Sequence, residues 1–460
     1  MDVIGKNVLV VGLGRTGRSV ARFLVSQGGH VCVSESRTGE ALTSALAHLD
    51  RLPVEVRPET DPELVLREID LVIPSPGVPA TAPLLTTAVS RKVPIWSEIE
   101  LAFRFLSCPI LAVTGTNGKS TTTTLLGEML RQAGRRVFTG GNLGTPLIEA
   151  MEIPYDVAVA EISSFQLEWV HRFRPQIGLF LNLSEDHLDR HGNVETYGAV
   201  KRRLFSQQRS ADWVVMNRDD QLIPSLCQEL PGQLFSFGWA LPSENSSDRA
   251  EARAWQGSWQ GAWIDTGTLV VRHADQETRY PLDGLRIRGR HNIANVMAAV
   301  SAATLWGTSP GVIRTVLAQF PGLPHRLEFV AEKKGVTYIN DSKGTNVNAV
   351  VQSLRSFSGP IILLAGGVEK GGDYRSLRDL VRTRVKKLIL FGQAQNVLQA
   401  ALGGETETLR VEALDAAVQA AQIGAQAGDT VLLSPACASF DQFQNYTHRG
   451  EVFRSYVEAL

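Results

Sequence analysis

Short runs of consecutive apolar residues recur along the chain, and several lead into a glycine-rich turn and then a helical pattern. The runs NVLVV, PILAV and PIILL lead into the turns GLGRTG, GTNGK and GGVEKGG. Further runs of this kind stand in VTYIN, KLILF and DTVLL. Strands that are apolar on both faces, alternating with amphipathic helices, are typical of parallel sheets covered by helices on both sides. The pattern therefore predicts an α/β protein.

The length of the chain and the breaks in this pattern predict three α/β units. The chain has 460 residues, and a single core seldom grows beyond ~250–300 residues. A helix precedes a fresh strand in WSEIELAFRFLSCP, and prolines with a glycine interrupt helical patterning in FPGLPHR. We therefore expect domains at residues 1–97, 98–322 and 323–460. The most polar segment, LPSENSSDRAEARAWQGSWQG, is interpreted as a surface loop and a strand hairpin carrying Trp255 and Trp259.

Composition describes an ordinary globular protein and excludes several classes. Apolar residues make up 43% and charged residues 20% of the chain, and the net charge of −1 gives no general attraction to nucleic acid or anionic lipid. The four cysteines form no CxxC motif, which suits a reducing compartment and disfavours a zinc site. The start MDVIGKN leads directly into a strand, without a signal peptide, and no apolar run approaches the ~20 residues of a membrane span. We expect a cytoplasmic protein that binds no nucleic acid and does not insert into a membrane.

The first glycine-rich turn has the spacing of a nucleotide-binding motif. GLGRTG, from Gly12 to Gly17, matches G-x-G-x-x-G between a strand and a helix, and Glu35 ends the next strand. This is the context of the dinucleotide-binding fingerprint. A tight turn whose glycines only allow close helix packing explains the same residues equally well. The motif also leaves open which nucleotide would bind.

The second turn, within TGTNGKSTTTTLL, predicts a phosphate site. The N–H groups at the start of the following helix attract anions, and glycines let phosphate oxygens approach the backbone. Lys119 adds a full charge, and Ser120 can hold a magnesium ion. A standard P-loop would need a glycine where Val113 stands, and the chain offers Gly115 instead, so the loop is shorter. An ordinary capped helix with a surface lysine is the alternative.

Other features of the central unit would complete a phosphate and metal site. Glu161 follows the apolar run Val157–Ala160, as a Walker-B acid follows its strand. The segment LFLNLSEDHLDRHG is a strand that ends in a dense polar cluster including His187. Lys201 falls inside the apolar stripe of the helix NVETYGAVKRRLF, so it must snorkel, pair or lose its charge. A solvated carboxylate, a surface histidine and a snorkelling lysine are the respective alternatives.

The third unit has polar turns after its predicted strands. IND is followed by SKGTN, LLAGG by VEKGGD, and LLSPA by CASFDQFQNY. Because the carboxyl ends of parallel strands meet at one edge of a sheet, these turns would form one crevice. Each turn taken singly is also explained by ordinary turn chemistry.

The order of these motifs resembles that of the Mur ligases of peptidoglycan precursor synthesis, over essentially the whole chain. It runs GTNGKST, EISSFQLE, NLSEDHLDRHG, YGAVK, RHNIAN, GLPHRLE, NDSKGTN and SPACASFDQF. GTNGKST marks a wider family that includes folylpolyglutamate synthases, and the shorter glycine spacing is that family's own form of the loop. NDSKGTN with SPACASFDQF resembles the D-glutamate-adding branch, although Gly344 stands where alanine is expected more often.

The resemblance implies a domain plan and a set of ligand contacts. A Rossmann-like first domain would bind the UDP part of a nucleotide sugar, a central P-loop ATPase-like parallel-sheet domain ATP, and a C-terminal Rossmann-like domain the incoming amino acid. The implied nucleotide-sugar contacts are Gly14, Arg15, Thr16, Glu35, Ser36, Arg37, Ser75, Gly77, Asn142 and His187. The implied ATP contacts are Gly115, Thr116, Asn117, Gly118, Lys119, Ser120, Thr121, Asn292, Asn295, Arg326 and Asp341. Those implied for D-glutamate are Lys343, Thr345, Lys370, Ser439, Phe440 and Tyr446.

The resemblance also implies a reaction. The alanine carboxylate of UDP-N-acetylmuramoyl-L-alanine would attack the γ-phosphate of ATP, and the amine of D-glutamate would attack the resulting acyl phosphate. The implied catalytic residues are Lys119, Asn142, His187 and Lys201. One magnesium ion would lie on Ser120 and Glu161, and a second near His187 and a CO2-derived carbamate on Lys201. We expect the chain to act as a monomer.

Rival interpretations explain fewer motifs. A dehydrogenase built on GLGRTG and Glu35 leaves the central phosphate loop without a role. A non-catalytic nucleotide switch or motor leaves the polar turns of the third unit without one. An L-alanine-adding or folate-type ligase is the nearest alternative within the same family.

Overall fold

The computed structural model describes residues 3–37, 39–47, 49, 52–58, 61–241, 260–287 and 289–460. The chain divides into two compact units, which are described separately. One unit comprises Met1–Asp283 with Ala294–Val316, and the other Gly284–Ile293 with Leu317–Leu460. Trp255 and Trp259, for which a loop and hairpin were expected, lie outside the described residues.

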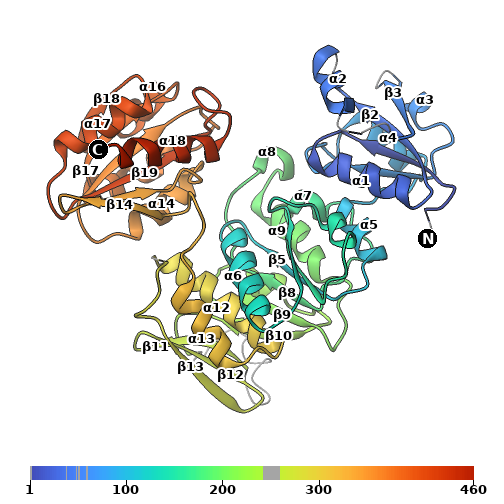
Figure 1. The fold of residues 1–460 in the computed structure, drawn as a ribbon, viewed down its shortest axis with the longest axis horizontal. Helices are drawn as coiled ribbons and strands as arrows, with labels where there is room; N and C mark the ends of the chain where they lie inside the picture. The colour runs from blue at the N-terminus through green and yellow to red at the C-terminus, as the bar shows by residue number, and fades with distance from the viewer. Residues whose placement is uncertain are drawn as a thin grey trace. The chain divides into compact units, whose positions relative to one another are not determined.

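The N-terminal part of the first unit, drawn in blue in Figure 1, contains a parallel sheet. The strand order of this sheet is β3-β2-β1-β4. Val8 and Val10 of β1 pack into one apolar cluster, and Leu9 and Val11 pack into another. Because successive side chains of a strand point to opposite faces, β1 is buried on both, as its continuous apolar run predicts. The strands are β1 (Asn7–Val11), β2 (His30–Glu35), β3 (Val54–Pro58) and β4 (Leu71–Pro74). The helices are α1 (Arg15–Ser26), α2 (Gly39–Ala47), α3 (Pro62–Val65) and α4 (Pro83–Ser90).

The central sheet runs in the order β13-β12-β11-β10-β9-β8-β5-β7-β6. It is parallel from β6 through β11, as expected for the central domain, and the antiparallel strands β12 and β13 extend it at one edge, so the whole sheet is mixed. The strands are β5 (Ile110–Thr114), β6 (Val137–Gly141), β7 (Val157–Glu161), β8 (Ile177–Phe180), β9 (Trp213–Asn217), β10 (Gln233–Phe237), β11 (Gly261–Asp265), β12 (Thr268–His273) and β13 (Gln276–Pro281). The helices and 3-10 turns are α5 (Glu98–Phe105), α6 (Lys119–Gln132), η1 (Leu147–Met151), α7 (Ser164–Leu167), α8 (Leu188–His191), α9 (Val194–Arg202), η2 (Arg203–Phe205), α10 (Ile223–Leu226), α12 (Arg290–Leu305) and α13 (Pro310–Gln319).

The second unit carries a sheet in the order β14-β15-β19-β16-β17-β18, parallel except for β14 at its edge. Ile361 and Leu363 of β16 pack on one face, and Ile362 and Leu364 on the other. The strands are β14 (Glu328–Lys333), β15 (Val336–Asn340), β16 (Ile361–Gly366), β17 (Val385–Phe391), β18 (Glu407–Arg410) and β19 (Thr430–Ala436). The helices are α14 (Val347–Arg355), η3 (Tyr374–Leu377), α15 (Arg378–Arg384), α16 (Gln395–Leu402), α17 (Leu414–Gly424) and α18 (Tyr446–Glu458).

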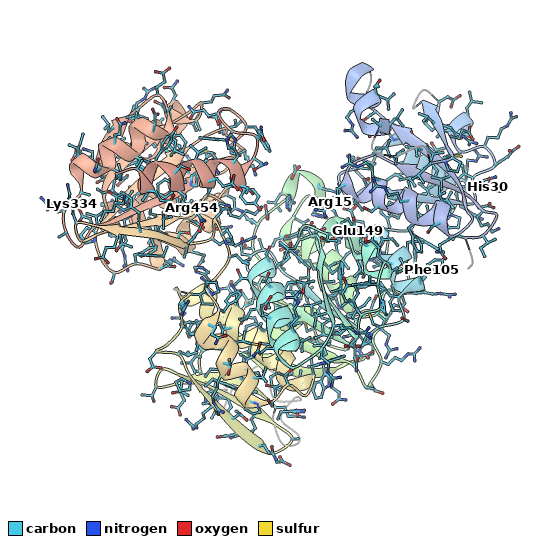
Figure 2. All side chains as sticks on the ribbon, in the orientation of Figure 1. Arg15, His30, Phe105, Glu149, Lys334 and Arg454 are labelled. Carbon is cyan, nitrogen blue, oxygen red and sulfur yellow. The ribbon has the colours of Figure 1, made fainter. Side chains whose placement is uncertain are left out.

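Helix α1 is joined to the central part of the first unit by polar contacts. Ser19 Oγ donates to Glu149 Oε1 at 2.6 Å, and Arg15 Nη2 donates to Thr145 Oγ1 at 3.3 Å. Figure 2 labels Arg15 and Glu149. Within the described part of the chain, no helix combines the length and apolarity needed to cross a bilayer.

Candidate active site

A cleft of about 550 Å³ lies beside the glycine-rich turn that follows β1. Its walls also come from the ends of β2 and β4 and from the segment after β6. Every residue expected to contact the nucleotide sugar lines this cleft except His187. Those in the wall are Gly14, Arg15, Thr16, Glu35, Ser36, Arg37, Ser75, Gly77 and Asn142.

The turn at this cleft is closely packed and also suited to bind phosphate. Gly12 has a φ of +83°, and a Cβ on Gly17 would stand 2.0 Å from the carbonyl oxygen of Gly12. Helix α1 begins at Arg15, its N-cap Gly14 provides no side-chain cap, and Gly14, Arg15 and Thr16 all line the cleft. Helix N-termini of this kind attract anions. Both interpretations of the motif therefore fit this turn.

Glu35 provides a fixed negative charge in the same wall. Its Oε2 accepts hydrogen bonds from the Leu13 N–H at 2.7 Å and from Arg37 Nη2 at 2.6 Å. The Arg37 guanidinium lowers the pKa of Glu35 to about 2, so the carboxylate is ionised at neutral pH. An anion here repels phosphate groups and suits hydrogen-bond donors of a base or sugar.

The second turn forms a compact loop between β5 and α6. Gly115 and Gly118 have φ angles of +149° and +83°, which disfavour any residue with a side chain. Lys119 Nζ folds back over the loop and donates to the carbonyl oxygens of Gly115 at 3.0 Å and Thr116 at 2.8 Å. Gly118 packs directly against Asn295 of α12, whose Oδ1 would lie 2.1 Å from an added Cβ.

Asn182, in the polar cluster after β8, holds the same loop in shape. Its Oδ1 accepts from the Asn117 N–H at 2.8 Å, and its Nδ2 donates to the Asn117 carbonyl at 3.0 Å. The Thr116 N–H donates to the Asn182 carbonyl at 2.9 Å. Asn182, just after the neighbouring strand β8, therefore holds the backbone of this shorter loop through three hydrogen bonds.

Ser120 and Glu161 lie together at the start of α6. Ser120 Oγ donates to Glu161 Oε2 at 2.6 Å, and Asn142 Nδ2 donates to Glu161 Oε1 at 2.6 Å. A buried hydroxyl and carboxylate are hard oxygen ligands of the kind magnesium prefers. Among the described residues, no group of three or more His, Cys, Asp or Glu side chains is arranged so that it could hold a metal ion. A magnesium ion at this pair would therefore need further oxygens from substrate or water.

Lys201 lies inside the protein with its amine at the phosphate loop. The residue is 1% exposed, which excludes snorkelling, and Nζ donates to the Gly115 carbonyl oxygen at 2.9 Å. Nζ also stands 4.3 Å from the centre of the Tyr197 ring. Burial, followed by the nearby charge of Lys119, holds the pKa of Lys201 well below its ordinary value.

His187 occupies the loop after β8 and is not part of the cleft wall. It adopts a left-handed conformation with φ +53° before α8, and its side chain is 47% exposed. Its ring lies 4.8 Å from the ring of Phe165, and Nε2 is 3.6 Å from Asp186 Oδ2. The site expected for the second magnesium therefore combines this exposed imidazole with the buried amine of Lys201.

The second unit gathers its polar turns at the carboxyl ends of β15, β16 and β19. Asp341 accepts hydrogen bonds from Ser353 Oγ at 2.6 Å and Ser434 Oγ at 2.7 Å. Burial raises the pKa of Asp341 to about 6. Lys343 Nζ stands 4.1 Å from the centre of the Tyr446 ring. An added Cβ on Gly344 would lie 2.5 Å from Asp341 Oδ2, so glycine leaves room for this carboxylate.

The other residues expected at the amino-acid pocket differ in exposure. Ser439 is buried, Lys370 is exposed, and Phe440 is 72% exposed. Thr345 is half-buried, and its N–H donates to the Lys343 carbonyl at 2.8 Å. Of the ATP contacts, Arg326 and Asp341 belong to the second unit. Asn292 also belongs to it, although Asn295, one turn further along α12, belongs to the first.

Arg449 connects the polar turns of the second unit and was not predicted. It is fully buried and donates to Ser342 Oγ at 3.0 Å, the Gly366 carbonyl at 3.4 Å and the Cys437 carbonyl at 3.3 Å. Ser342 and Cys437 belong to the turns after β15 and β19, and Gly366 is the last residue of β16. In the sequence, Arg449 stands near the start of the helical segment NYTHRGEVF, a position that is typical of an exposed side chain.

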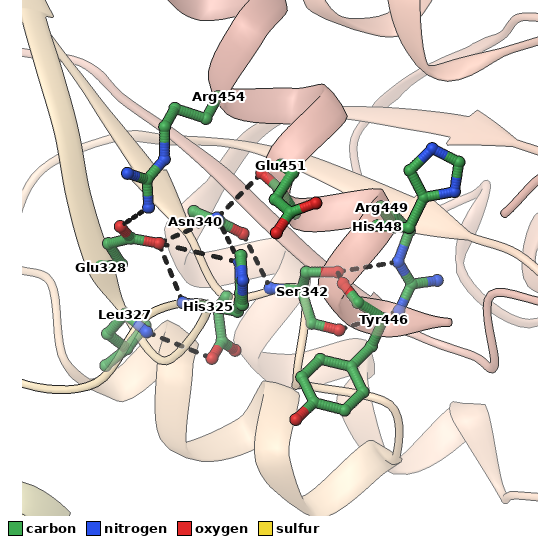
Figure 3. A network of polar contacts seen from close by, with 12 residues as sticks. His325, Leu327, Glu328, Asn340, Ser342, Tyr446, His448, Arg449, Glu451 and Arg454 are labelled. Carbon is green, nitrogen blue, oxygen red and sulfur yellow. Dashed lines mark hydrogen bonds and ion pairs between the residues drawn. The ribbon is translucent and has the colours of Figure 1, made fainter. Parts of the chain in front are cut away.

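A second network, around His325, joins the segment before β14 to the same turns (Figure 3). Glu328 Oε2 accepts from the His325 N–H at 2.8 Å and from Asn340 Nδ2 at 3.0 Å, and its other oxygen pairs with Arg454. The His325 carbonyl accepts from the Lys343 N–H at 3.0 Å. The segment that carries Arg326 is thereby held against the turn that carries Lys343.

Comparison with known proteins gives this arrangement a family. The Mur ligase MurD-like N-terminal domain matches residues 6–97, the Mur ligase middle domain residues 113–303, and the Mur ligase glutamate ligase domain residues 325–437. The chain is 45% identical over 457 residues to the UDP-N-acetylmuramoylalanine–D-glutamate ligase of Syntrophotalea carbinolica, covering 99% of this chain and 98% of that one. It is 43% identical to the ligase of the same name from Geotalea daltonii, over 100% and 99% of the two chains. The chain belongs to the Mur ligase family.

Solved structures of other Mur ligases and a related enzyme share the fold. A pseudomurein peptide ligase type C from Methanothermus fervidus superposes with a TM-score of 0.61 at 18% identity, covering 99% of this chain and 100% of that one. MurF from Thermotoga maritima, solved with ADP, gives a TM-score of 0.60 at 16% identity over 94% and 95% of the two chains. The expected α/β fold with three Mur ligase domains is therefore confirmed.

Proposed function

We propose that this Mur ligase joins D-glutamate to UDP-N-acetylmuramoyl-L-alanine, with ATP converted to ADP and phosphate, as a cytoplasmic step of peptidoglycan precursor synthesis. The observation that carries the proposal is the 45% identity over 99% of the chain to a ligase named for this reaction. We assign the nucleotide sugar to the cleft of the first unit and ATP to the phosphate loop, on the shape of the cleft and the contacts of the loop.

Activation of the carboxylate is assigned to the phosphate loop. A carboxylate is a poor acyl donor, and transfer of the γ-phosphoryl group to it makes an acyl phosphate. Negative charge spreads over the phosphoryl oxygens in this step, so donors fixed around them lower the barrier. Lys119 and the N–H groups at the start of α6 are such donors. Magnesium held by Ser120 and Glu161 would supply further positive charge at these oxygens.

Lys201 is proposed to carry a carbamate formed with CO2. Only a neutral amine attacks CO2, and burial favours the neutral form of this lysine. The product is an anion, which turns an inward lysine beside the phosphate loop into a metal-binding group. His187, in the loop after β8, would contribute to the same second metal site.

The turns of the second unit are proposed to bind D-glutamate. Lys343 and Lys370 supply positive charge for its carboxylates, and Thr345 and Ser439 supply hydrogen-bond donors. The amine then attacks the acyl carbonyl, the tetrahedral intermediate collapses, and phosphate leaves with one oxygen of the original carboxylate. The side chains of Arg449 and Asp341 keep the strand ends that carry these residues in place.

Isotope transfer tests the proposed acyl phosphate. The alanine carboxylate of the nucleotide sugar is labelled with ¹⁸O, and the phosphate released with ATP and D-glutamate is analysed by mass spectrometry. The proposal predicts that ¹⁸O enters the phosphate once per turnover. Product formation with unlabelled phosphate would contradict activation of this carboxylate.

A further inference from the structure

A small cavity lies where the Pro74–Val78 segment meets the central part of the first unit. Its volume is about 10 Å³, and its wall includes Ser75, Ser97, Glu98, Gln166, Trp169 and Arg190. Ser75 and Gln166 also line the large cleft, so this cavity shares part of its wall with the proposed nucleotide-sugar site.

Polar atoms without partners occur on three residues of this wall. Within the described residues, Ser97 Oγ, Glu98 Oε2 and Trp169 Nε1 are buried and have no hydrogen-bond partner of normal geometry. Glu98 is 1% exposed and Ser97 is 4% exposed. A buried polar atom without a partner costs about 1–3 kcal/mol, so several around one cavity indicate a missing partner.

One water molecule satisfies this arrangement. A cavity needs roughly 10–15 Å³ and two to four polar neighbours to hold a water, and this cavity is about 10 Å³. The chemistry is complementary, because Trp169 Nε1 only donates, the Glu98 carboxylate accepts, and Ser97 Oγ does either. A water that accepts from Trp169 and donates to Glu98 and Ser97 leaves none of the three atoms unpaired.

The cavity lies at a joint that is already held by direct contacts. Arg190 donates to the carbonyl oxygens of Pro76 at 3.2 Å and Val78 at 2.8 Å, and it is paired with Glu168. The Ser97 N–H donates to the Trp169 carbonyl at 3.0 Å. Glu98 Oε1 accepts from the Ile148 N–H at 2.6 Å. Glu98 therefore contacts two regions near the cleft. It lines the small cavity together with the Pro74–Val78 segment, and it binds η1, which directly follows the Asn142–Pro146 part of the cleft wall.

We propose that a single buried water, held by Glu98, Ser97 and Trp169, fills the cavity whose wall includes Pro74, Ser75, Pro76 and Val78, and that Glu98 is thereby a positioning residue for the nucleotide sugar. The proposal rests on the function proposed above. Glu98 does not line the large cleft, so it acts through Ser75, Gly77 and the segment after β6.

Steady-state kinetics with the full-length enzyme at pH 8, where Glu98 is ionised, tests the positioning role. Glu98→Gln keeps an acceptor for Ile148 but puts an amide donor at the water site, and Trp169→Phe removes only the indole donor. Both variants are expected to raise KM for the nucleotide sugar by about tenfold, the effect of one lost hydrogen bond, with kcat and KM for ATP within about twofold. Glu100→Gln is the matched control, because Glu100 is a buried carboxylate on the same helix that binds the Arg172 and Phe173 N–H groups away from the cavity. It is expected to lower stability and leave all KM values unchanged.

Unchanged KM in Glu98→Gln and Trp169→Phe, or equal changes for every substrate, would overturn the positioning role. A crystal structure of the ligand-free protein at high resolution tests the water independently, with density expected within hydrogen-bond distance of Glu98, Ser97 and Trp169. A dry cavity would overturn the proposal. If the wild-type enzyme fails to turn over the nucleotide sugar, the proposed function fails. In that case, the affinity of the same variants for UDP, measured by calorimetric titration, and the crystal structure still test whether the cavity holds the proposed water.

Discussion

At the scale of single residues, two lysines donate to the same carbonyl oxygen, that of Gly115. Lys119 is half-buried on the loop, whereas Lys201 is enclosed by the protein. The same chemical group is therefore placed in two environments. Burial of Lys201 favours the neutral amine that reacts with CO2.

Changing Lys119 to Ala is expected to remove turnover without unfolding the protein. A charge-stabilising contact of this kind is worth about 10²–10³ in rate, and a half-buried turn lysine contributes little to stability. Activity and the thermal midpoint are measured together, with Lys334→Ala as an exposed control. Normal turnover in Lys119→Ala would show that the loop does not bind the transferred phosphoryl group.

Changing Lys201 to Ala is expected to abolish activity because it removes the proposed carbamate. A short carboxylic acid in solution supplies a similar anion, so acetate or formate is expected to restore part of the activity. The assay compares Lys201→Ala with Arg202→Ala, whose side chain donates to the Leu226 carbonyl away from the loop. Wild-type activity in Lys201→Ala would exclude the carbamate.

Changing Glu98 to Gln is expected to stabilise the folded protein more at pH 8 than at pH 5. Burial raises the pKa of Glu98 from 4.5 to about 7, and the neighbouring Glu149 adds to the shift. The folded protein therefore retains a proton that the unfolded chain has lost, so stability falls as pH rises from about 4.5 to about 7. Above pH 7, the ionisation of buried Glu98 lowers the free energy of unfolding by about 3 kcal/mol. Chemical unfolding at both pH values measures it, and equal gains at pH 5 and pH 8 would contradict the shift.

At the scale of elements, the start of α6 depends on close contact between a glycine and α12. Gly118 and Gly134 both have φ near +80°, but only Gly118 packs against another side chain, that of Asn295. Replacing either with Ala is expected to cost about 1 kcal/mol of backbone strain. Only Gly118→Ala is expected to weaken ATP binding as well, because it displaces Asn295. Calorimetric titration with ATP distinguishes the variants, and equal affinities would contradict the role of this contact.

The strands and phosphate-binding turns could be predicted because their signals are local. Apolar runs followed by glycine-rich turns fall at β1–α1 and β5–α6, and Lys201 was identified from its place in one apolar stripe. Arg449 could not be found in this way, because its acceptor Ser342 is 107 residues away in sequence. The water-sized cavity was equally hidden, since its wall combines residues from Pro74 to Arg190. Long-range polar contacts leave no periodic pattern in the chain.

At the scale of the whole molecule, each sheet presents its carboxyl ends as a candidate binding site. The first carries the large cleft, the central one the phosphate loop, and the third the turns joined by Arg449. The domain boundaries expected at residues 97 and 322 remain predictions. A ligase that joins two substrates and consumes ATP has three ligands to bind, one for each of these candidate sites.

The most direct test of the account is ADP release with UDP-N-acetylmuramoyl-L-alanine and each of several amino acids. The account predicts that release depends on D-glutamate and on both other substrates, and that L-glutamate and L-alanine do not replace it. Turnover with UDP-N-acetylmuramate and L-alanine that equals or exceeds turnover with D-glutamate would contradict the assignment.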